Sequence, residues 1–240
     1  MDLKEQDILG PEIGRHWYYV SKGRALRALL GGARVPEVLD VGAGSGVFAR
    51  QLLAAGMCDR AVCVDPNYAE ERIEQAQGKE IEFRRSVDDV TQQLILMIDV
   101  LEHVDDDQTL LQRYVERAPR SASVLISVPA FQFLWSGHDV FLEHRRRYTR
   151  GQVEALVRRA GLEVVRSRYF FAILFPLVAL MRLRDRWRLQ NGHVAARSAL
   201  TRQRPVANAV LTALHSLERV SLLRINRLAG LSVLCLARRP

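Results

Sequence analysis

The chain has 240 residues, 48% of them hydrophobic, so it can bury one large core and carry an appended subdomain. Its net charge of +8, from 35 lysines and arginines, favours anionic partners such as phosphorylated substrates, nucleic acid or an acidic membrane surface. The three cysteines form no C-x-x-C pair, which argues against a disulfide framework and a cysteine-based zinc site. The first residues are charged and lack the apolar core of a signal peptide, so the expected location is the cytoplasm.

Residues 1–32 are expected to form an N-terminal arm and helix that act as a lid. Residues 1–14 are predicted to be a mobile arm, and a short helix is predicted over 22–30. Between them stands an aromatic cluster that contains Trp17 and Tyr18. These rings either cover a cofactor pocket or pack on the edge of the sheet, and the sequence leaves both alternatives open.

A strand predicted to end near Asp40 is followed by Gly42, Ala43, Gly44 and Gly46, and then by a helical pattern. Strand, glycine turn and helix open a nucleotide-binding βαβ unit, in which glycines let a ligand approach the backbone. Asp40 and the glycine spacing depart from the dinucleotide pattern G-x-G-x-x-G, which argues against NAD. A carboxylate beside the turn suits a cationic group, such as the ammonium or sulfonium of S-adenosylmethionine (SAM).

Strands and helices alternate along the chain, which predicts a parallel sheet covered by helices on both faces. Apolar stretches predict strands at 37–41, 61–65, 81–85, 94–99, 123–128, 163–168 and 231–237. Apolar residues at helical spacing predict helices at 46–55, 68–77, 105–117 and 150–160. The segment between the third and fourth strands is short, so its connection is expected to be a turn.

Acidic residues follow the predicted strands. Asp65, before Pro66, is placed to accept both ribose hydroxyls, and Asp88 is placed to meet the adenine amino group. Asp99 ends the fourth strand and is expected to line the methionine pocket. Because ligands of open α/β sheets bind at the carboxyl ends of the strands, these acids are expected around one pocket.

In this order and spacing, the motifs resemble those of class I SAM-dependent methyltransferases. Asp40 with the glycines resembles the first motif, Asp65 the ribose acid, Asp88 the adenine acid, and the run at 99–104 the fourth motif. The resemblance covers about residues 15–170, with 231–238 as the last strand. It implies a Rossmann-like, doubly wound sheet of seven strands, the seventh antiparallel and beside the fifth, with SAM as the cofactor and S-adenosylhomocysteine (SAH) as the product. The chain looks like a bacterial small-molecule subgroup whose members mostly lack assigned substrates.

The loop after the fifth strand is expected to stand over the methyl donor. Methyl transfer needs an in-line acceptor, desolvation and often a base, and histidine suits that base near neutral pH. The catalytic candidates are His138, His103 and His144. Asp139 is placed to orient His138, although the two could equally be a loop-stabilising pair. For His103, a structural role, in which its hydrogen bond shapes the pocket, is favoured over a catalytic one.

The same loop offers candidates for acceptor binding. Arginine forks match carboxylate or phosphate groups, which favours an anionic acceptor. The candidates are Trp135, Asp139, Arg146, Arg147 and Tyr148, and Trp17 is added to the cofactor site. No metal is expected, since no cluster of carboxylates and histidines has ligand spacing along the chain.

A helical insertion, 170–229, is expected between strands six and seven of a single domain, 1–240. Its run 170–181 is the most apolar of the chain, is too short to span a bilayer and has arginines on both sides. This run is expected either to anchor the protein at a membrane interface or to form one wall of an apolar substrate pocket. The alternative is that it forms the end of a strand and a buried helix. A linker is predicted over 190–205, and an amphipathic helix over 206–220 forms a cap or a dimer surface.

The sequence therefore predicts transfer of a methyl group from SAM to a small molecule, apolar or lipid-linked with an anionic group, and most readily at oxygen. Nucleic-acid methylation is favoured by the charge but disfavoured because no Asn/Asp-Pro-Pro-Tyr/Phe segment follows the fourth strand. A non-catalytic SAM-binding protein at a membrane surface is a further alternative. Peripheral contact with the inner membrane face and a homodimer are left open.

Overall fold

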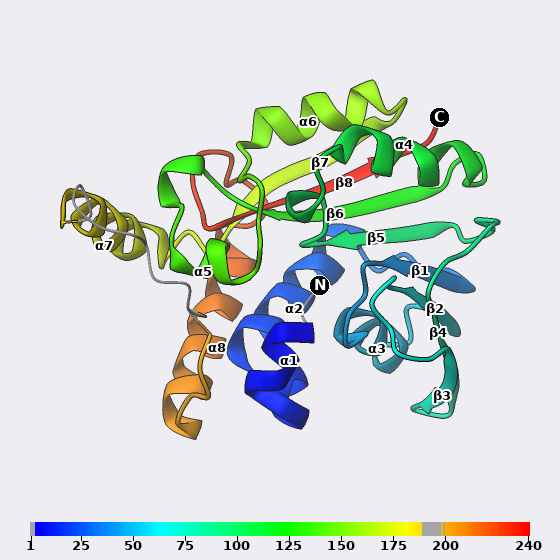
Figure 1. Cartoon of the computed structure of the whole chain (residues 1–240), viewed down its shortest axis with the longest axis horizontal. Coiled ribbons are helices and arrows are strands. Elements are labelled where there is room, and N and C mark those ends of the chain that lie inside the picture. The colour runs from blue at the N-terminus through cyan, green and yellow to red at the C-terminus, as the bar shows by residue number, and fades with distance from the viewer. Residues whose placement is uncertain (1–2, 189–197, 199) are drawn as a thin grey trace.

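The computed structural model describes residues 3–188, 198 and 200–240 (Figure 1). Within these residues, eight strands form one sheet in the order β3-β4-β2-β1-β5-β6-β8-β7. The strands are β1 Glu37–Val41, β2 Arg60–Val64, β3 Arg72–Ala76, β4 Lys79–Arg84, β5 Leu94–Ile98, β6 Ser123–Pro129, β7 Glu163–Phe170 and β8 Ser232–Arg238. Five neighbours, from β4 to β6, are parallel, and β8 lies antiparallel between β6 and β7, as expected for the last strand.

The eighth strand, β3, replaces the helix predicted over 68–77, and that prediction was wrong. β3 pairs antiparallel with β4 through a two-residue turn at Gln77 and Gly78. Both residues have positive φ angles, 57° and 72°. Such a turn matches the twist of the two strands and makes a hairpin, which ends any helix at this point. The apolar spacing was therefore outweighed by the turn that follows it.

Helices cover both faces of the sheet. The described helices are α1 Leu3–Leu9, α2 Trp17–Leu30, α3 Val47–Ala54, α4 Asp107–Arg117, α5 Gly137–Phe141, α6 Arg150–Arg159, α7 Phe175–Arg188 and α8 Pro205–Ser221, with short 3-10 turns η1 Gly10–Arg15, η2 Leu101–His103 and η3 Gln132–Leu134. In Figure 1, α4 and α6 lie on one face, and α1, α2 and α3 lie on the other. Each face has its own core of buried apolar residues. The helices predicted at 46–55, 105–117 and 150–160 are confirmed.

The N-terminal region is helical where an arm was predicted. α1 and η1 occupy residues 3–15, and α2 begins at Trp17 instead of residue 22. The side chain of His16 accepts a hydrogen bond from the Tyr18 backbone at 3.4 Å and caps the helix start. The first turn then buries Tyr19, which is 2% exposed, so packing extends the helix toward its N-terminus.

The insertion after β7 contains α7 and α8, and residues 190–197 and 199 of the predicted linker lie outside the described residues. α8 confirms the helix predicted over 206–220 and packs on α2, where the Trp17 backbone donates to the Asn208 side chain at 2.7 Å. α7 is not a buried helix, since Leu177 and Leu180 are 58% and 67% exposed. Of the helices in the described ranges, none has the length and apolarity needed to cross a membrane.

Candidate active site

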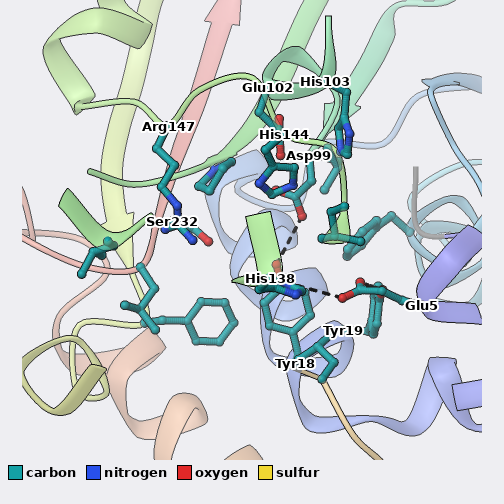
Figure 2. Close-up of a pocket in the computed structure, with 18 of the residues that line it drawn as sticks. Glu5, Tyr18, Tyr19, Asp99, Glu102, His103, His138, His144, Arg147 and Ser232 are labelled. Atoms are coloured by element: carbon teal, nitrogen blue, oxygen red, sulfur yellow. Dashed lines mark hydrogen bonds and ion pairs between the residues drawn. The ribbon is translucent and has the colours of Figure 1, made fainter. Parts of the chain in front are cut away.

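A cavity of about 280 Å³ lies at the carboxyl ends of β1, β5 and β6 (Figure 2). Its walls come from α1, α2, the glycine turn, η2, α5, the loop before α6 and α7. The predicted site residues that line it are Trp17, Asp40, Gly42, Ala43, Asp99, His103, His138, His144 and Arg147. Outside its lining lie Gly44, Gly46, Asp65, Pro66, Asp88, Trp135, Asp139, Arg146 and Tyr148. Residues from five separate segments thus meet at the predicted edge of the sheet.

The glycine turn needs its glycines for their backbone conformation. Gly42, Gly44 and Gly46 have φ angles of 66°, 52° and 69°, a region that other residues rarely adopt. Asp65 is buried and braces the turn from the next strand, accepting from the Gly44 N–H at 3.2 Å and from the Asn67 N–H at 3.0 Å. Asp88 is exposed beyond β4.

The cavity wall at this turn fits the cationic end of SAM. Gly42 and Ala43 present backbone with almost no side chain, and Asp40 and Asp99 line the same cavity. Two carboxylates near the ammonium and sulfonium groups supply the charge that a cation requires. When bound, SAM supplies the electrophilic methyl group.

Lys22 was missed by the sequence analysis, and no local signal marks it. Its side chain is fully buried and its ammonium donates to the Asp99 carboxylate and to the Tyr18 hydroxyl. Ser127 donates to the other oxygen of Asp99 at 2.8 Å. Burial opposes ionisation of Asp99, but Lys22 and Ser127 hold its pKa below the usual value. Asp99 therefore reaches the cavity as half of an ion pair.

Three histidines from different segments meet at the cavity. His103 ends η2, His138 lies in α5, and His144 follows α5. The ring centroids of His103 and His144 are 4.7 Å apart, and those of His138 and His144 are 6.3 Å apart. Burial lowers the pKa of His138 to about 4 and that of His103 to about 3, so both rings are neutral at pH 7.

Asp139 lies behind this wall and orients two of its side chains. Its Oδ1 atom is 2.8 Å from His144 Nδ1 and accepts from Arg147 Nε at 2.7 Å. The Ser136 N–H donates to Oδ2 at 2.8 Å as part of a capping box that turns the carboxylate inward. From the sequence this carboxylate was expected to orient His138, its neighbour in the chain, whereas its hydrogen bond goes to His144.

Arg146 and Tyr148, predicted to contact the acceptor, fasten the loop to the start of α4. Arg146 donates to the Asp105 backbone carbonyl at 2.7 Å. The Tyr148 hydroxyl donates to Asp107 at 2.7 Å and is buried. Trp135 is partly buried beside η3. These contacts hold the loop that carries His144 and Arg147 over the cavity.

Two acidic residues of the cavity also escaped the sequence analysis. Glu102 is fully buried beside His103, and its place inside the run at 99–104 was the available signal. Glu5 comes from α1 and accepts from the Tyr19 hydroxyl at 2.6 Å. Its Oε1 atom lies 3.7 Å from His138 Nε2, which links the N-terminal helix to the site. No sequence pattern indicates that contact.

A family model described as a methyltransferase domain matches residues 15–167. No curated protein matches the chain. One similar solved structure is the complex between the Haloferax volcanii Trm112 methyltransferase activator and the putative methyltransferase, at 15% identity and TM-score 0.56, covering 95% of this chain and 92% of that one. A putative sarcosine dimethylglycine methyltransferase from Galdieria sulphuraria is 15% identical (TM-score 0.54; 91% and 85% covered), and a SAM-dependent methyltransferase from Archaeoglobus fulgidus is 16% identical (TM-score 0.53; 98% of both).

These structures share the fold of this chain. The family match spans most of the chain and includes the glycine turn, the acids that follow the strands and most of the residues that line the cavity at their carboxyl ends. The chain therefore belongs to the methyltransferase-domain family and is a SAM-dependent methyltransferase.

Proposed function

We propose that the enzyme methylates a hydroxyl oxygen of a small apolar acceptor that carries an anionic group. The observation that carries this proposal is that a neutral histidine and two arginines enter the same cavity as the glycine turn. His138, Arg147 and Arg182 all line it. The charge of the arginines suits a carboxylate or phosphate on the acceptor.

Apolar side chains that also line the cavity support an apolar acceptor body. Leu174, Val178 and Arg182 recur every four residues, so one face of the α7 segment lines the cavity. Leu134 and Leu142 line it from the loop before α6. Apolar lining residues bind the body of a ligand by burying it, while the polar side chains of the cavity set its orientation.

His138 is the proposed general base. Its ring is neutral at pH 7 because burial lowers its pKa, so it can accept the hydroxyl proton. The carboxylate of Glu5, 3.7 Å from Nε2, stabilises the imidazolium that forms. As the acceptor oxygen bonds to the methyl carbon, the carbon–sulfur bond of SAM breaks and its electron pair stays on sulfur, giving SAH.

The outer face of α7 supports an acceptor drawn from an anionic membrane surface. Leu177, Leu180 and Leu183 are 58%, 67% and 53% exposed on a segment rich in arginine. In Figure 1, α7 projects away from the sheet. Apolar side chains with flanking arginines suit the interface of anionic lipids. Flotation with phosphatidylglycerol vesicles should recover the protein, and phosphatidylcholine vesicles should not; equal recovery, or none, would contradict this contact.

The reaction is tested with purified protein, isotope-labelled SAM and a panel of small aromatic and aliphatic acceptors. Each alcohol is offered beside its amine counterpart and with or without a carboxylate or phosphate, and an RNA pool forms a separate arm. We expect label in the anionic alcohols. Label confined to amines would exclude oxygen, and label in RNA alone would exclude the small acceptor.

A further inference from the structure

Glu102 is a buried carboxylate without a direct counter-charge among the described residues. It is 0% exposed, and neither oxygen has a hydrogen-bond partner on any other described residue. The ammonium of Lys22, which also faces this region, is already paired with Asp99. A buried carboxylate in this position is stable only with a proton or a cation beside it.

Two histidines complete a group of three ligand atoms. One nitrogen each of His103 and His144 and one carboxylate oxygen of Glu102 lie within 4.8 Å of one another. The two rings meet edge to face, at 86°. Figure 2 shows the three side chains gathered at one end of the cavity, which all three line. Sequence spacing did not indicate this group because His144 comes from a different loop.

A contact behind His144 fixes the orientation of its ring. The Nδ1 atom of His144 is 2.8 Å from Asp139, which is itself held by Arg147, so Nε2 is the nitrogen left for a ligand. A carboxylate behind a histidine is the usual support of a metal-binding imidazole, because it sets the tautomer and the ring angle. Asp139 is 0% exposed, so this support is built into the core of the loop.

We infer that Glu102, His103 and His144 bind one divalent transition-metal ion, of the zinc type, which coordinates the acceptor oxygen. Two imidazole nitrogens and one carboxylate suit Zn²⁺ and its first-row neighbours, whereas Mg²⁺ and Ca²⁺ prefer oxygen ligands throughout. Three protein ligands leave coordination positions open toward the cavity, as in catalytic zinc sites.

The role of this ion rests on the proposed methylation at oxygen. A hydroxyl bound to a divalent cation has a lowered pKa and loses its proton more readily. The proton passes to His138 or to solvent, and the acceptor oxyanion then forms its bond to the methyl carbon. The carbon–sulfur bond breaks with both electrons on sulfur, so the ion changes neither its charge nor its oxidation state.

The first test measures metal binding without SAM or acceptor. Full-length protein is stripped with EDTA and titrated calorimetrically with zinc chloride, and then with magnesium chloride. We expect one Zn²⁺ per chain and at least about 100-fold weaker Mg²⁺ binding. Cobalt chloride supplies an optical signature, since d–d bands report nitrogen and oxygen ligands. Absence of Zn²⁺ binding would overturn the site and leave the proposed function standing.

Variants assign the bound ion to this group. Glu102→Gln, His103→Asn and His144→Ala should each weaken Zn²⁺ binding by at least about tenfold and change the cobalt spectrum. Glu5→Gln and His138→Asn serve as matched controls, because they remove a buried carboxylate and a histidine from the same cavity but from outside the group. Thermal unfolding shows which variants fold. Because there are three ligand variants, the test does not depend on the folding of any single one. Equal binding by ligand and control variants would overturn the assignment.

A second test separates the role of the metal from the reaction. SAM affinity is measured by calorimetry in stripped and zinc-loaded protein, and methyl transfer is then measured for an acceptor found in the panel above. We expect unchanged SAM affinity and at least about tenfold faster transfer with zinc. Equal rates with and without zinc would show that the ion takes no part in methyl transfer, whatever the outcome of the binding experiment.

Discussion

Lys22 on α2, whose side chain is fully buried, forms an ion pair with the partly exposed Asp99 at the carboxyl end of β5. The pair joins the N-terminal helix to the strand end that lines the cavity, and Tyr18 shares the same ammonium. Neither charge has another direct partner of opposite sign among the described residues, so this ion pair joins α2 to the site.

Replacing Lys22 should destabilise the fold. Lys22→Met leaves the partly buried Asp99 carboxylate without its counter-charge, which should cost about 3 kcal/mol of unfolding free energy in urea at pH 7, the low end for a buried pair. Lys22→Met combined with Asp99→Asn should recover most of that loss, because both charges are gone. Arg34→Met, which breaks an exposed pair with Asp59, should change little. Equal effects of Lys22→Met and Arg34→Met would show that the buried pair has no special weight.

The Asp139 contacts should make stability fall in acid. Although burial opposes ionisation, hydrogen bonds from His144 and Arg147 hold the pKa of Asp139 below its usual value. The stabilisation is therefore complete above the unfolded pKa, about 4, and is lost as pH falls through the lower folded pKa. Asp139→Asn should lose about 3–5 kcal/mol at pH 7, and its difference from the wild type should shrink in acid. Urea unfolding across this range measures it; a constant difference would contradict the assignment.

If His138 is the base, the pH dependence of kcat/KM should lack the usual histidine limb. Burial lowers its pKa to about 4, so the neutral ring persists and kcat/KM should not fall between about pH 8 and 5.5 through protonation of this base. An unperturbed histidine would give a limb near pH 6.5. His138→Gln should lower kcat by about 10²–10⁴-fold with unchanged SAM affinity. A limb near pH 6.5 that disappears in His138→Gln would contradict the lowered pKa. An unchanged kcat in His138→Gln would show that His138 is not the base.

Arg182 and Arg184 offer a matched pair on α7. Arg182 lines the cavity, whereas Arg184 is exposed and absent from its lining. Arg182→Met should raise KM for an anionic acceptor about 10–100-fold, as expected for loss of a charged hydrogen bond. Arg184→Met should leave KM unchanged, and neither variant should alter SAM affinity. Equal effects on a neutral acceptor analogue would show that Arg182 acts through packing instead of charge.

Asp65 tests the cofactor assignment. Asp65→Ala removes the proposed partner of the ribose hydroxyls and should weaken SAM and SAH binding by at least about tenfold in calorimetric titration. Because Asp65 also accepts from Gly44, thermal unfolding is measured alongside to show that the variant folds. Asp59→Ala, at an exposed acid near the start of β2, is the control. Affinity retained in a folded Asp65→Ala variant would remove this residue from the cofactor site.

Much of the fold was readable from sequence because local patterns determine it. Apolar runs located the five parallel strands and the antiparallel last strand. Positive φ angles at Gly42, Gly44 and Gly46 explain why the glycine spacing marks a turn. The helix predicted over 68–77 failed because apolar spacing alone does not separate a helix from a hairpin. Gln77 and Gly78 decide it, since their backbone conformation closes a two-residue turn.

The site required the tertiary structure. Sequence indicated His103, His138 and His144 as candidates, but which ring receives the Asp139 carboxylate depends on how α5 and its loop pack. Lys22 carries no local signal, because its role arises only where α2 crosses the end of β5. The sequence by itself thus determined the reaction class through the order of strand-end motifs. The packing of distant segments decided which side chains share one low-dielectric cavity, where charge and hydrogen bonding set their chemistry.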